Sequence, residues 1–225
     1  MTERGMIFNA EMVLAILDGR KTQTRRIMKV QPSEDFTPMN MALEPDYKAR
    51  WYTPGIVDKD GYLQPANKEA FGVANENEGY SCPFGAVGDR IWVRETWARY
   101  NIDQDSHDMA YRATTPADWP GEGHWRPSIH MPRWASRILL EITDVRVERL
   151  NSLSEEDAMR EGIDADRLAE SQDNYDCIAD HNMTGRPTAK GYFSDLWQSI
   201  YGSDSWNANP CVWVIEFKRV EGGAE

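Results

Sequence analysis

The sequence has few cysteines and no long apolar run. Its three cysteines, Cys82, Cys177 and Cys211, lie far apart in 225 residues, and an odd count in a cytoplasmic chain argues against a disulfide framework. No apolar run approaches the roughly 20 residues that a membrane helix needs. The first residues lack the apolar core and the small-residue cleavage site of a signal peptide. We therefore expect a cytoplasmic protein that makes no contact with a membrane.

The short motifs of common metal and nucleotide sites are also missing. There is no C-x-x-C, and the four histidines form no H-x-x-x-H pair. There is no P-loop, no G-x-G-x-x-G and no G-x-S-x-G, so the commonest nucleotide-binding and hydrolase fingerprints are absent. We expect neither a metal nor a cofactor, although a metal site built from distant residues stays open.

The sequence is rich in apolar residues and in negative charge. Hydrophobic residues make up 40% of the chain and include nine tryptophans, which is ample for a packed core and excludes wholesale disorder. Acidic residues outnumber basic ones by 37 to 25, for a formal net charge of −12. Residues 151–182 hold ten acids and two bases, so much of that charge lies in one stretch.

Alternating apolar residues predict three main strands, over residues 90–96, 137–150 and 211–220. Within 137–150 the alternation changes phase near Asp144, which predicts a β-bulge or bend. In 211–220, Val212 and Val214 face opposite Trp213, Ile215 and Phe217.

Caps and helical spacing predict three helices. Asn9 is suited to cap a helix that Gly19 ends, and apolar residues recur at helical spacing between them. Ser154 opens a short helix that Gly162 ends, and residues 192–200 form a second clear amphipathic pattern. Strands outnumber helices and are interspersed with them, so we predict an α+β fold.

Residues 31–85 differ in composition from the rest of the chain. They contain six of the twelve prolines and five glycines, and their periodic apolar patterning is weak. We interpret them as a loop-rich insertion with at most a short hairpin. The insertion would belong to the same domain as a core made of residues 1–30 and 86–225.

Residues 20–29 concentrate positive charge in an acidic protein. They carry five bases and no acid directly after Gly19. Such a run is often only a solvated surface, but it also predicts a positive patch that binds an anion or nucleic acid. Thr22 and Thr24 could bond phosphates or act as nucleophiles. Neighbouring guanidinium groups favour the neutral form of Lys21, which a lysine base requires.

Two further features bear on chemistry. Glu161 lies in the last turn of its predicted helix, so it is either an inconsequential surface carboxylate or a carboxyl group used for proton transfer. Trp197 and Trp213 lie in periodic patterns that indicate core positions. Tryptophans near turns or in loops could instead stack on a base. These are Trp92, Trp97, Trp125, Trp134 and Trp206.

Several motifs follow one another along the chain. They are GRKTQTRR at 19–26, GDRIWVRETW at 88–97, IHMPRWASRI at 129–138, FSDLW at 193–197, W-x-x-N-P at 206–210 and VWVIEF at 212–217. Together they resemble the ASCH domain, which is related to the PUA fold, and in particular ASCH proteins of phages and prophages. The resemblance covers residues 5–30 and 86–220 and leaves the insertion out.

The resemblance implies a small β-barrel flanked by helices, with a cleft for RNA or a nucleoside. One branch, the small bacterial N4-acetylcytidine amidohydrolases, has the motif G-x-K-T-x-T-x-R. Gly19, Lys21, Thr22, Thr24 and Arg26 match that motif here. In that branch the threonine at the Thr24 position is the proposed nucleophile and the lysine at the Lys21 position activates it. A glutamate matched best by Glu161 handles protons.

These features predict a basic cleft that binds a nucleoside or RNA. Lys21, Thr24 and Glu161 would be catalytic if the protein hydrolyses the amide of an N-acylated cytosine. Arg20, Thr22, Arg25, Arg26 and Trp92 would contact the nucleoside or RNA. The chain departs from that branch in its greater length and in carrying Arg25 where an apolar residue is usual. Because Lys21 and Thr24 are three apart, they converge only if their segment is irregular.

Two other functions stay open. A non-catalytic RNA-binding module would keep the cleft without the chemistry. A protein-interaction role would use the acidic residues 151–182 to bind a basic partner or to mimic nucleic acid. The catalytic version requires Lys21, Thr24 and Glu161 to converge on one cleft. Because none of the three lies in an apolar periodic pattern, we expect their substitution to leave the fold intact.

Overall fold

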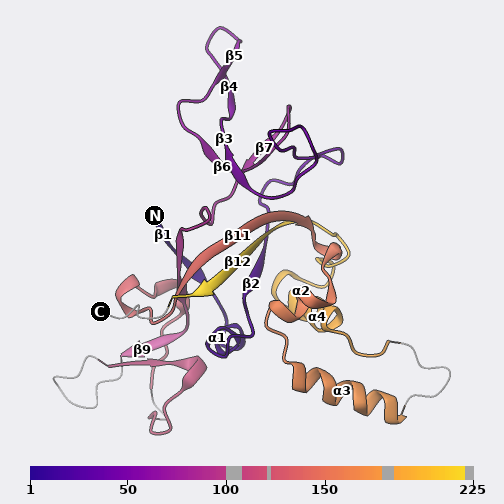
Figure 1. The fold of residues 1–225 in the computed structure, drawn as a ribbon. Helices are drawn as coiled ribbons and strands as arrows, with labels where there is room; N and C mark the ends of the chain where they lie inside the picture. Colours follow the sequence, from indigo (N-terminus) through magenta and orange to yellow (C-terminus); the bar gives the residue numbers. More distant parts are fainter. Residues whose placement is uncertain (100–107, 121–122, 179–184, 221–225) are drawn as a thin grey trace.

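The computed structural model describes residues 1–99, 108–120, 123–178 and 185–220, and its centre is a five-stranded sheet (Figure 1). In spatial order the strands are β1 (Glu3–Ile7), β8 (Arg90–Arg94), β11 (Leu139–Arg149), β12 (Cys211–Arg219) and β2 (Gln23–Ile27). β1 runs parallel to β8, and the other neighbouring strands pair antiparallel. The three strands predicted from alternation are therefore the three central strands of this sheet.

The central sheet is open. β1 and β2 flank helix α1 (Ala10–Leu17) in the sequence but lie at opposite edges of the sheet. In the described part of the chain no sheet closes on itself. The predicted α+β class is confirmed at this level, whereas the expectation of a closed barrel is wrong. β11 and β12 are the longest strands and pair with each other along their length. They lie between β1 and β2, which therefore do not pair with each other.

The register and burial of the long strands follow the sequence pattern. The pairing of β11 with β12 shifts between Ile142 and Asp144, which confirms the predicted bulge. Trp213 and Ile215 of β12 pack in the larger apolar cluster, which also contains residues of α1. Val212 and Val214 pack on the opposite face with α2 (Glu155–Arg160) and α4 (Ala189–Tyr201). β12 thus separates two cores.

The helix caps also follow the sequence. Oδ1 of Asn9 accepts a hydrogen bond from the backbone of Met12 at 2.8 Å, and Ser154 Oγ accepts one from the backbone of Asp157 at 3.0 Å. A further helix, α3 (Ala165–Ile178), is mostly exposed and extends away from the sheet (Figure 1). None of the helices in the described ranges has the length and apolarity needed to cross a membrane.

The insertion contains more strand than its sequence suggests. β3 (Arg50–Tyr52), β6 (Ala70–Ala74) and β7 (Gly79–Ser81) form a three-stranded antiparallel sheet, and β4 (Gly55–Val57) and β5 (Leu63–Pro65) form a hairpin. Phe36, Phe71 and Val73 of the insertion belong to the same apolar cluster as Ile91 and Ile215 of the central sheet. The insertion therefore shares the core of the central sheet.

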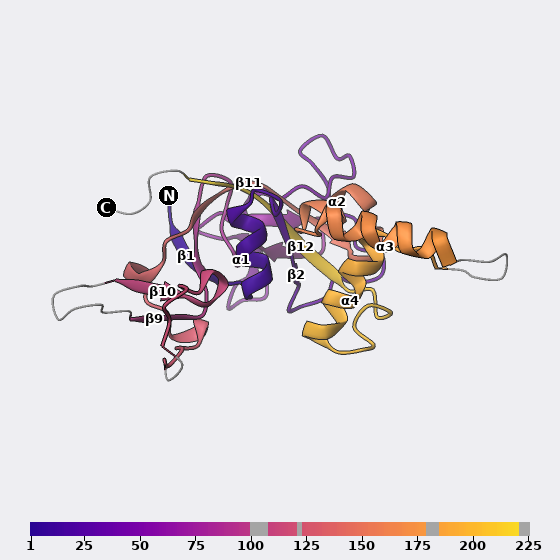
Figure 2. The same cartoon turned by 90° about the horizontal axis from the view of Figure 1, so that it is seen from below.

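A smaller layer lies beside α1, on the side opposite α2, α3 and α4 (Figure 2). It contains β9 (Trp97–Arg99), β10 (Met109–Tyr111) and the short 3-10 helices η1 (Arg112–Thr114), η2 (Ser128–His130) and η3 (Arg133–Ala135). Another 3-10 turn, η4 (Leu150–Ser152), connects β11 to α2. This arrangement leaves α1 and α4 on either side of the free edge of β2 (Figure 1).

Candidate functional site

Lys21 and Glu161 form a buried ion pair. Nζ of Lys21 donates to Oε2 of Glu161 at 2.7 Å and to the backbone carbonyl of Glu161, also at 2.7 Å. The side chain of Lys21 is 0% exposed and that of Glu161 is 2% exposed. Burial lowers the pKa of Lys21, and the neighbouring carboxylate opposes this effect without cancelling it.

Backbone contacts between the two residues just before β2 and the end of α2 place this pair. Lys21 and Glu161 form an isolated antiparallel bridge, and the backbone N–H of Thr22 donates to the carbonyl of Arg160 at 2.9 Å. Gly162 follows with φ of +102°, where a Cβ would lie 2.8 Å from a side chain of α1. A glycine is therefore needed for the chain to leave α2 so close to α1.

Arg25 on β2 adds a second cation to the same carboxylate. Its Nη1 donates to Oε1 of Glu161 at 3.0 Å, and its Nη2 contacts Glu148 at 3.0 Å and Asp157 at 3.2 Å. Arg146 of β11 contacts Glu148 and Asp157 as well. We call Lys21, Arg25, Arg146, Glu148, Asp157 and Glu161 the buried charge cluster. It joins β2, β11 and α2.

This cluster removes bases from the positive patch predicted at residues 20–29. The side chains of Lys21 and Arg25 are 0% exposed and paired with carboxylates, and Arg20 pairs with Asp18 at 3.0 Å. Removing a charge from water costs several kcal/mol unless a partner compensates it. The partners of Arg25 lie 123 to 136 positions away in the sequence, so a local reading of charge could not find them.

The same contacts bear on the acidic stretch 151–182. Two of its acids, Asp157 and Glu161, turn inward to the buried charge cluster and do not contribute to an acidic surface. Its other described acids lie on α2, α3 and the turn between them. Residues 179–182 lie outside the described residues. Binding of a basic partner by this stretch stays a prediction.

Two cavities meet at Glu161. The first has a volume of about 180 Å³ and lies at the free edge of β2, between α1 and α4. Most of its wall is apolar or aromatic, with Phe193, Trp197 and Tyr201 contributed by α4. Its polar wall consists of Asn9, Thr24, Arg25, Arg26 and Glu161. We call it the apolar cavity.

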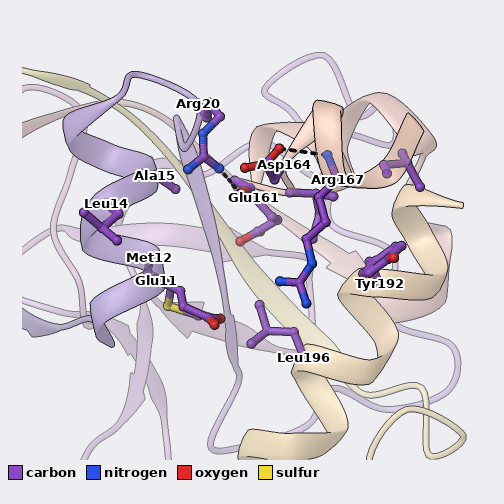
Figure 3. Close-up of a pocket in the computed structure, with 13 residues that line it drawn as sticks. Glu11, Met12, Leu14, Ala15, Arg20, Glu161, Asp164, Arg167, Tyr192 and Leu196 are labelled. Carbon is purple, nitrogen blue, oxygen red and sulfur yellow. Dashed lines mark hydrogen bonds between the residues drawn. The ribbon is translucent and has the colours of Figure 1, made fainter. Parts of the chain in front are cut away.

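The second cavity, which we call the polar cavity, has a volume of about 280 Å³. It shares Met12, Glu161 and Leu196 with the apolar cavity. Arg20 borders it on one side, where its Nη1 donates to the carbonyl of Gly162 at 2.7 Å. Figure 3 shows Arg167 extending from α3 into the space between α1 and α4. Its further polar wall includes Glu11, Asp164 and Tyr192.

The structure brings together some of the predicted site residues. Thr24 and Glu161 line the apolar cavity together, and Arg25 and Arg26 lie in the same wall. Arg20 lines the polar cavity. Lys21 lines neither cavity, because Glu161 and the backbone around it cover its amino group. The expected three-residue cleft is thus reduced to Thr24 and Glu161, with Lys21 behind the glutamate.

Two predicted contacts do not belong to the cavities. Thr22 is exposed and lines neither of them. Trp92 lies on β8, which β11 and β12 separate from β2. It stands opposite Gly5 in the sheet, and the guanidinium of Arg94 lies 5.4 Å from its ring. The expectation that Trp92 and Thr22 line the binding site is therefore wrong for these cavities.

The sequence reading missed other residues of the site. Trp197 is buried in the smaller core, as its spacing predicts, but it also lines the apolar cavity. Tyr192 and Arg167 line the polar cavity. Tyr192 belongs to the predicted amphipathic helix, whereas α3, which carries Arg167, has no apolar periodicity that would reveal it.

The described residues contain no group of three or more His, Cys, Asp or Glu side chains arranged to hold a metal ion. The two cavities instead contain a carboxylate held by two cations, a threonine in the wall of the apolar cavity, and arginine side chains in the walls of both cavities. Such a site can bind a polar planar molecule and move protons at one end of it. Comparisons of the chain with protein-family models, curated proteins and solved structures find no match.

Proposed function

We propose that the two adjoining cavities bind a pyrimidine nucleoside, free or within RNA, and that the protein hydrolyses the amide of an N-acylated cytosine. The observation that carries this proposal is the position of Glu161, which two buried cations hold in the shared wall of both cavities. A carboxylate in a cavity wall is a candidate for proton transfer to or from a bound molecule. The substrate class comes from the resemblance to ASCH amidohydrolases at Lys21, Thr24 and Glu161.

The volumes of the cavities support a nucleoside. A cavity of about 150 Å³ accommodates a benzene molecule, so the apolar cavity of about 180 Å³ suits a single ring with a small substituent. The polar cavity of about 280 Å³ offers both donors and acceptors, from Arg167, Tyr192 and Glu11. Sugar hydroxyl groups donate and accept hydrogen bonds, so this mixed wall suits a ribose.

In the proposed reaction, the hydroxyl oxygen of Thr24 attacks the acyl carbonyl carbon and its proton passes to Glu161. The adduct then breaks the C–N bond, and the departing exocyclic amine of the cytosine takes up that proton. Water attacks the acyl-threonine, again losing a proton to Glu161. That proton returns to the Thr24 oxygen as the carboxylic acid leaves. Lys21 and Arg25 are positioning residues, because both donate to Glu161.

We also propose that the fold is an open variant of the ASCH arrangement. Supporting this, three of the motif segments contribute strands to one sheet. Residues 19–26 include most of β2, residues 88–97 contain β8, and residues 212–217 lie in β12. Motifs that are distant in the sequence are thereby joined in one structural unit.

Incubation with N4-acetylcytidine, with cytidine measured by liquid chromatography, tests the proposed function. Thr24→Ser should retain part of the turnover, because serine keeps the hydroxyl group, and Thr24→Ala should lose at least about a thousand-fold. Thr22→Ala is the matched control, since Thr22 is exposed and lines neither cavity. Equal activity of Thr24→Ala and the unaltered protein would show that Thr24 is not the nucleophile.

Binding without hydrolysis is the second candidate function. It is favoured by one observation: the amino group of Lys21 donates to Glu161 and is sealed from the cavity that contains Thr24. A protein of this kind would bind cytidine or RNA but would release no product from any acylated cytidine. The turnover assay therefore separates the two candidates.

A further inference from the structure

Trp197 on α4 is buried, yet its indole N–H has no hydrogen-bond partner among the described residues. The residue is 3% exposed, and within the described part of the chain its Nε1 makes no hydrogen bond. Its ring packs against Phe193 and Tyr201, with centroids 5.9 Å and 4.4 Å away. Buried polar groups are nearly always hydrogen-bonded, and a bound ligand is one explanation for an exception.

The same cavity collects further donors without acceptors. Trp197, Arg25 and Arg26 all line the apolar cavity, and Nε of each arginine is buried with no partner among the described residues. Both carboxylate oxygens of Glu161 already accept from Lys21 and Arg25. Three residues that line the cavity thus carry an unpartnered N–H group, and a ligand would have to supply the acceptor.

Trp97 shows that a lone indole does not define a site. It is 2% exposed and its Nε1 also lacks a partner within the described ranges. However, it belongs to a separate apolar cluster with Met131 and Ala135 and lines neither cavity. Trp197 differs because it lines a cavity, together with Thr24, Glu161 and two arginines whose Nε atoms also lack a partner among the described residues.

We propose that Nε1 of Trp197, assisted by the N–H groups of Arg25 and Arg26, donates to the acyl carbonyl oxygen of the ligand. This inference rests on the proposed function and assigns an oxyanion site to it. When Thr24 attacks, the π electrons of the carbonyl move onto that oxygen, and donors already in place stabilise the negative charge. The ligand class is a planar ring with an N-acyl group, because an unacylated amine would present donors to donors.

The test compares Trp197→Phe with Trp97→Phe. Each change keeps an aromatic ring and removes one buried indole N–H, so the pair separates loss of the cavity donor from loss of packing. With N4-acetylcytidine as substrate, Trp197→Phe should lower kcat about a hundred-fold, the usual loss for one oxyanion donor, with KM within about three-fold. Trp97→Phe should leave both constants unchanged. If Trp197→Phe keeps kcat within two-fold, the inference is overturned while the proposed function stands.

Binding measurements decide the matter if the unaltered protein releases no cytidine. The inference then requires tighter binding of N4-acetylcytidine than of cytidine, and loss of that preference in Trp197→Phe. If the unaltered protein binds the two ligands equally, the inference is overturned.

Indole resonances of the unaltered protein provide a readout that needs no variant. N4-acetylcytidine should shift the Nε1–H signal of Trp197 and leave that of Trp97 in place. An unmoved Trp197 signal at saturating ligand overturns the inference.

Discussion

Replacing Glu161 with glutamine tests whether this carboxylate compensates the buried charge of Lys21. Glutamine keeps the shape and removes the negative charge between two cations that are 0% exposed in their side chains. Arg25 would retain Glu148 and Asp157, whereas Lys21 would lose its one carboxylate partner in the described structure. The main consequence is therefore an uncompensated ammonium group in the protein interior.

The expected loss is large for a single substitution. Breaking a buried pair by removing one partner costs about 3–5 kcal/mol. Lys21 could instead lose its proton, and deprotonating a lysine of pKa about 10.4 at pH 7 costs about 4.6 kcal/mol, which limits the loss to a similar value. For a chain of 225 residues this corresponds to a fall in melting temperature of roughly 6–20 °C. Because Glu161 is 4% exposed, we expect this substitution to destabilise the fold, in place of the expectation drawn from the sequence pattern alone.

The loss should depend on pH. Because burial lowers the pKa of Lys21, the unfolded chain binds more protons than the folded one between that lowered pKa and about 10.4. Stability therefore rises with pH through this window, and removing Glu161 extends the window to lower pH. Glu161→Gln should regain stability between pH 7 and pH 9, by up to about 1.4 kcal/mol per pH unit, and the unaltered protein should gain less.

Urea unfolding followed by tryptophan fluorescence at pH 7, 8 and 9 measures both effects. Glu156→Gln is the matched control, because Glu156 lies on the same helix with its side chain 75% exposed and pairs only with Arg160 among the described residues. Its loss should stay below about 1 kcal/mol at every pH. A loss below about 1 kcal/mol for Glu161→Gln as well, with no pH dependence, would refute the compensation of Lys21 by Glu161.

Two further outcomes are expected. Gly162→Ala should destabilise the protein by more than Gly202→Ala, by at least about 1 kcal/mol in urea unfolding. The two glycines have φ of +102° and +100°, but an added Cβ meets α1 only at Gly162; equal losses would contradict this packing. Arg167→Ala should weaken cytidine binding about ten-fold in calorimetry, as expected for a lost hydrogen bond to a charged group. Arg160→Ala should leave the affinity for cytidine unchanged. Equal affinities of the two variants would show that the polar cavity does not bind the sugar.

Local signals in the sequence were sufficient for the central sheet and its caps. Asn9 and Ser154 cap α1 and α2 through side-chain oxygens, which is a contact between residues three apart. The bulge at Asp144 follows from a phase change that can be read along a single strand. Such features depend on neighbours in the sequence, so one chain suffices to predict them.

Features that depend on distant partners could not be predicted in this way. The basic run at residues 20–29 gives no sign that Arg25 points inward, because the acids that neutralise it lie on β11 and α2. α3 lacks an apolar stripe, and the strands of the insertion are short and rich in glycine and proline. The burial of Lys21 likewise depends on a bridge to Glu161 across 140 positions.

The free edge of β2 explains why stability and the candidate chemistry involve the same residues. An exposed strand edge invites unwanted pairing, and proteins usually cover it. Here the end of α2 covers the residues just before β2, through the bridge between Lys21 and Glu161 and the bond from Thr22 to Arg160. The adjoining part borders the apolar cavity at Thr24. Glu161 is therefore fixed by the contacts that protect the edge, so a substitution that loosens this cover should also displace the carboxylate from the cavity wall.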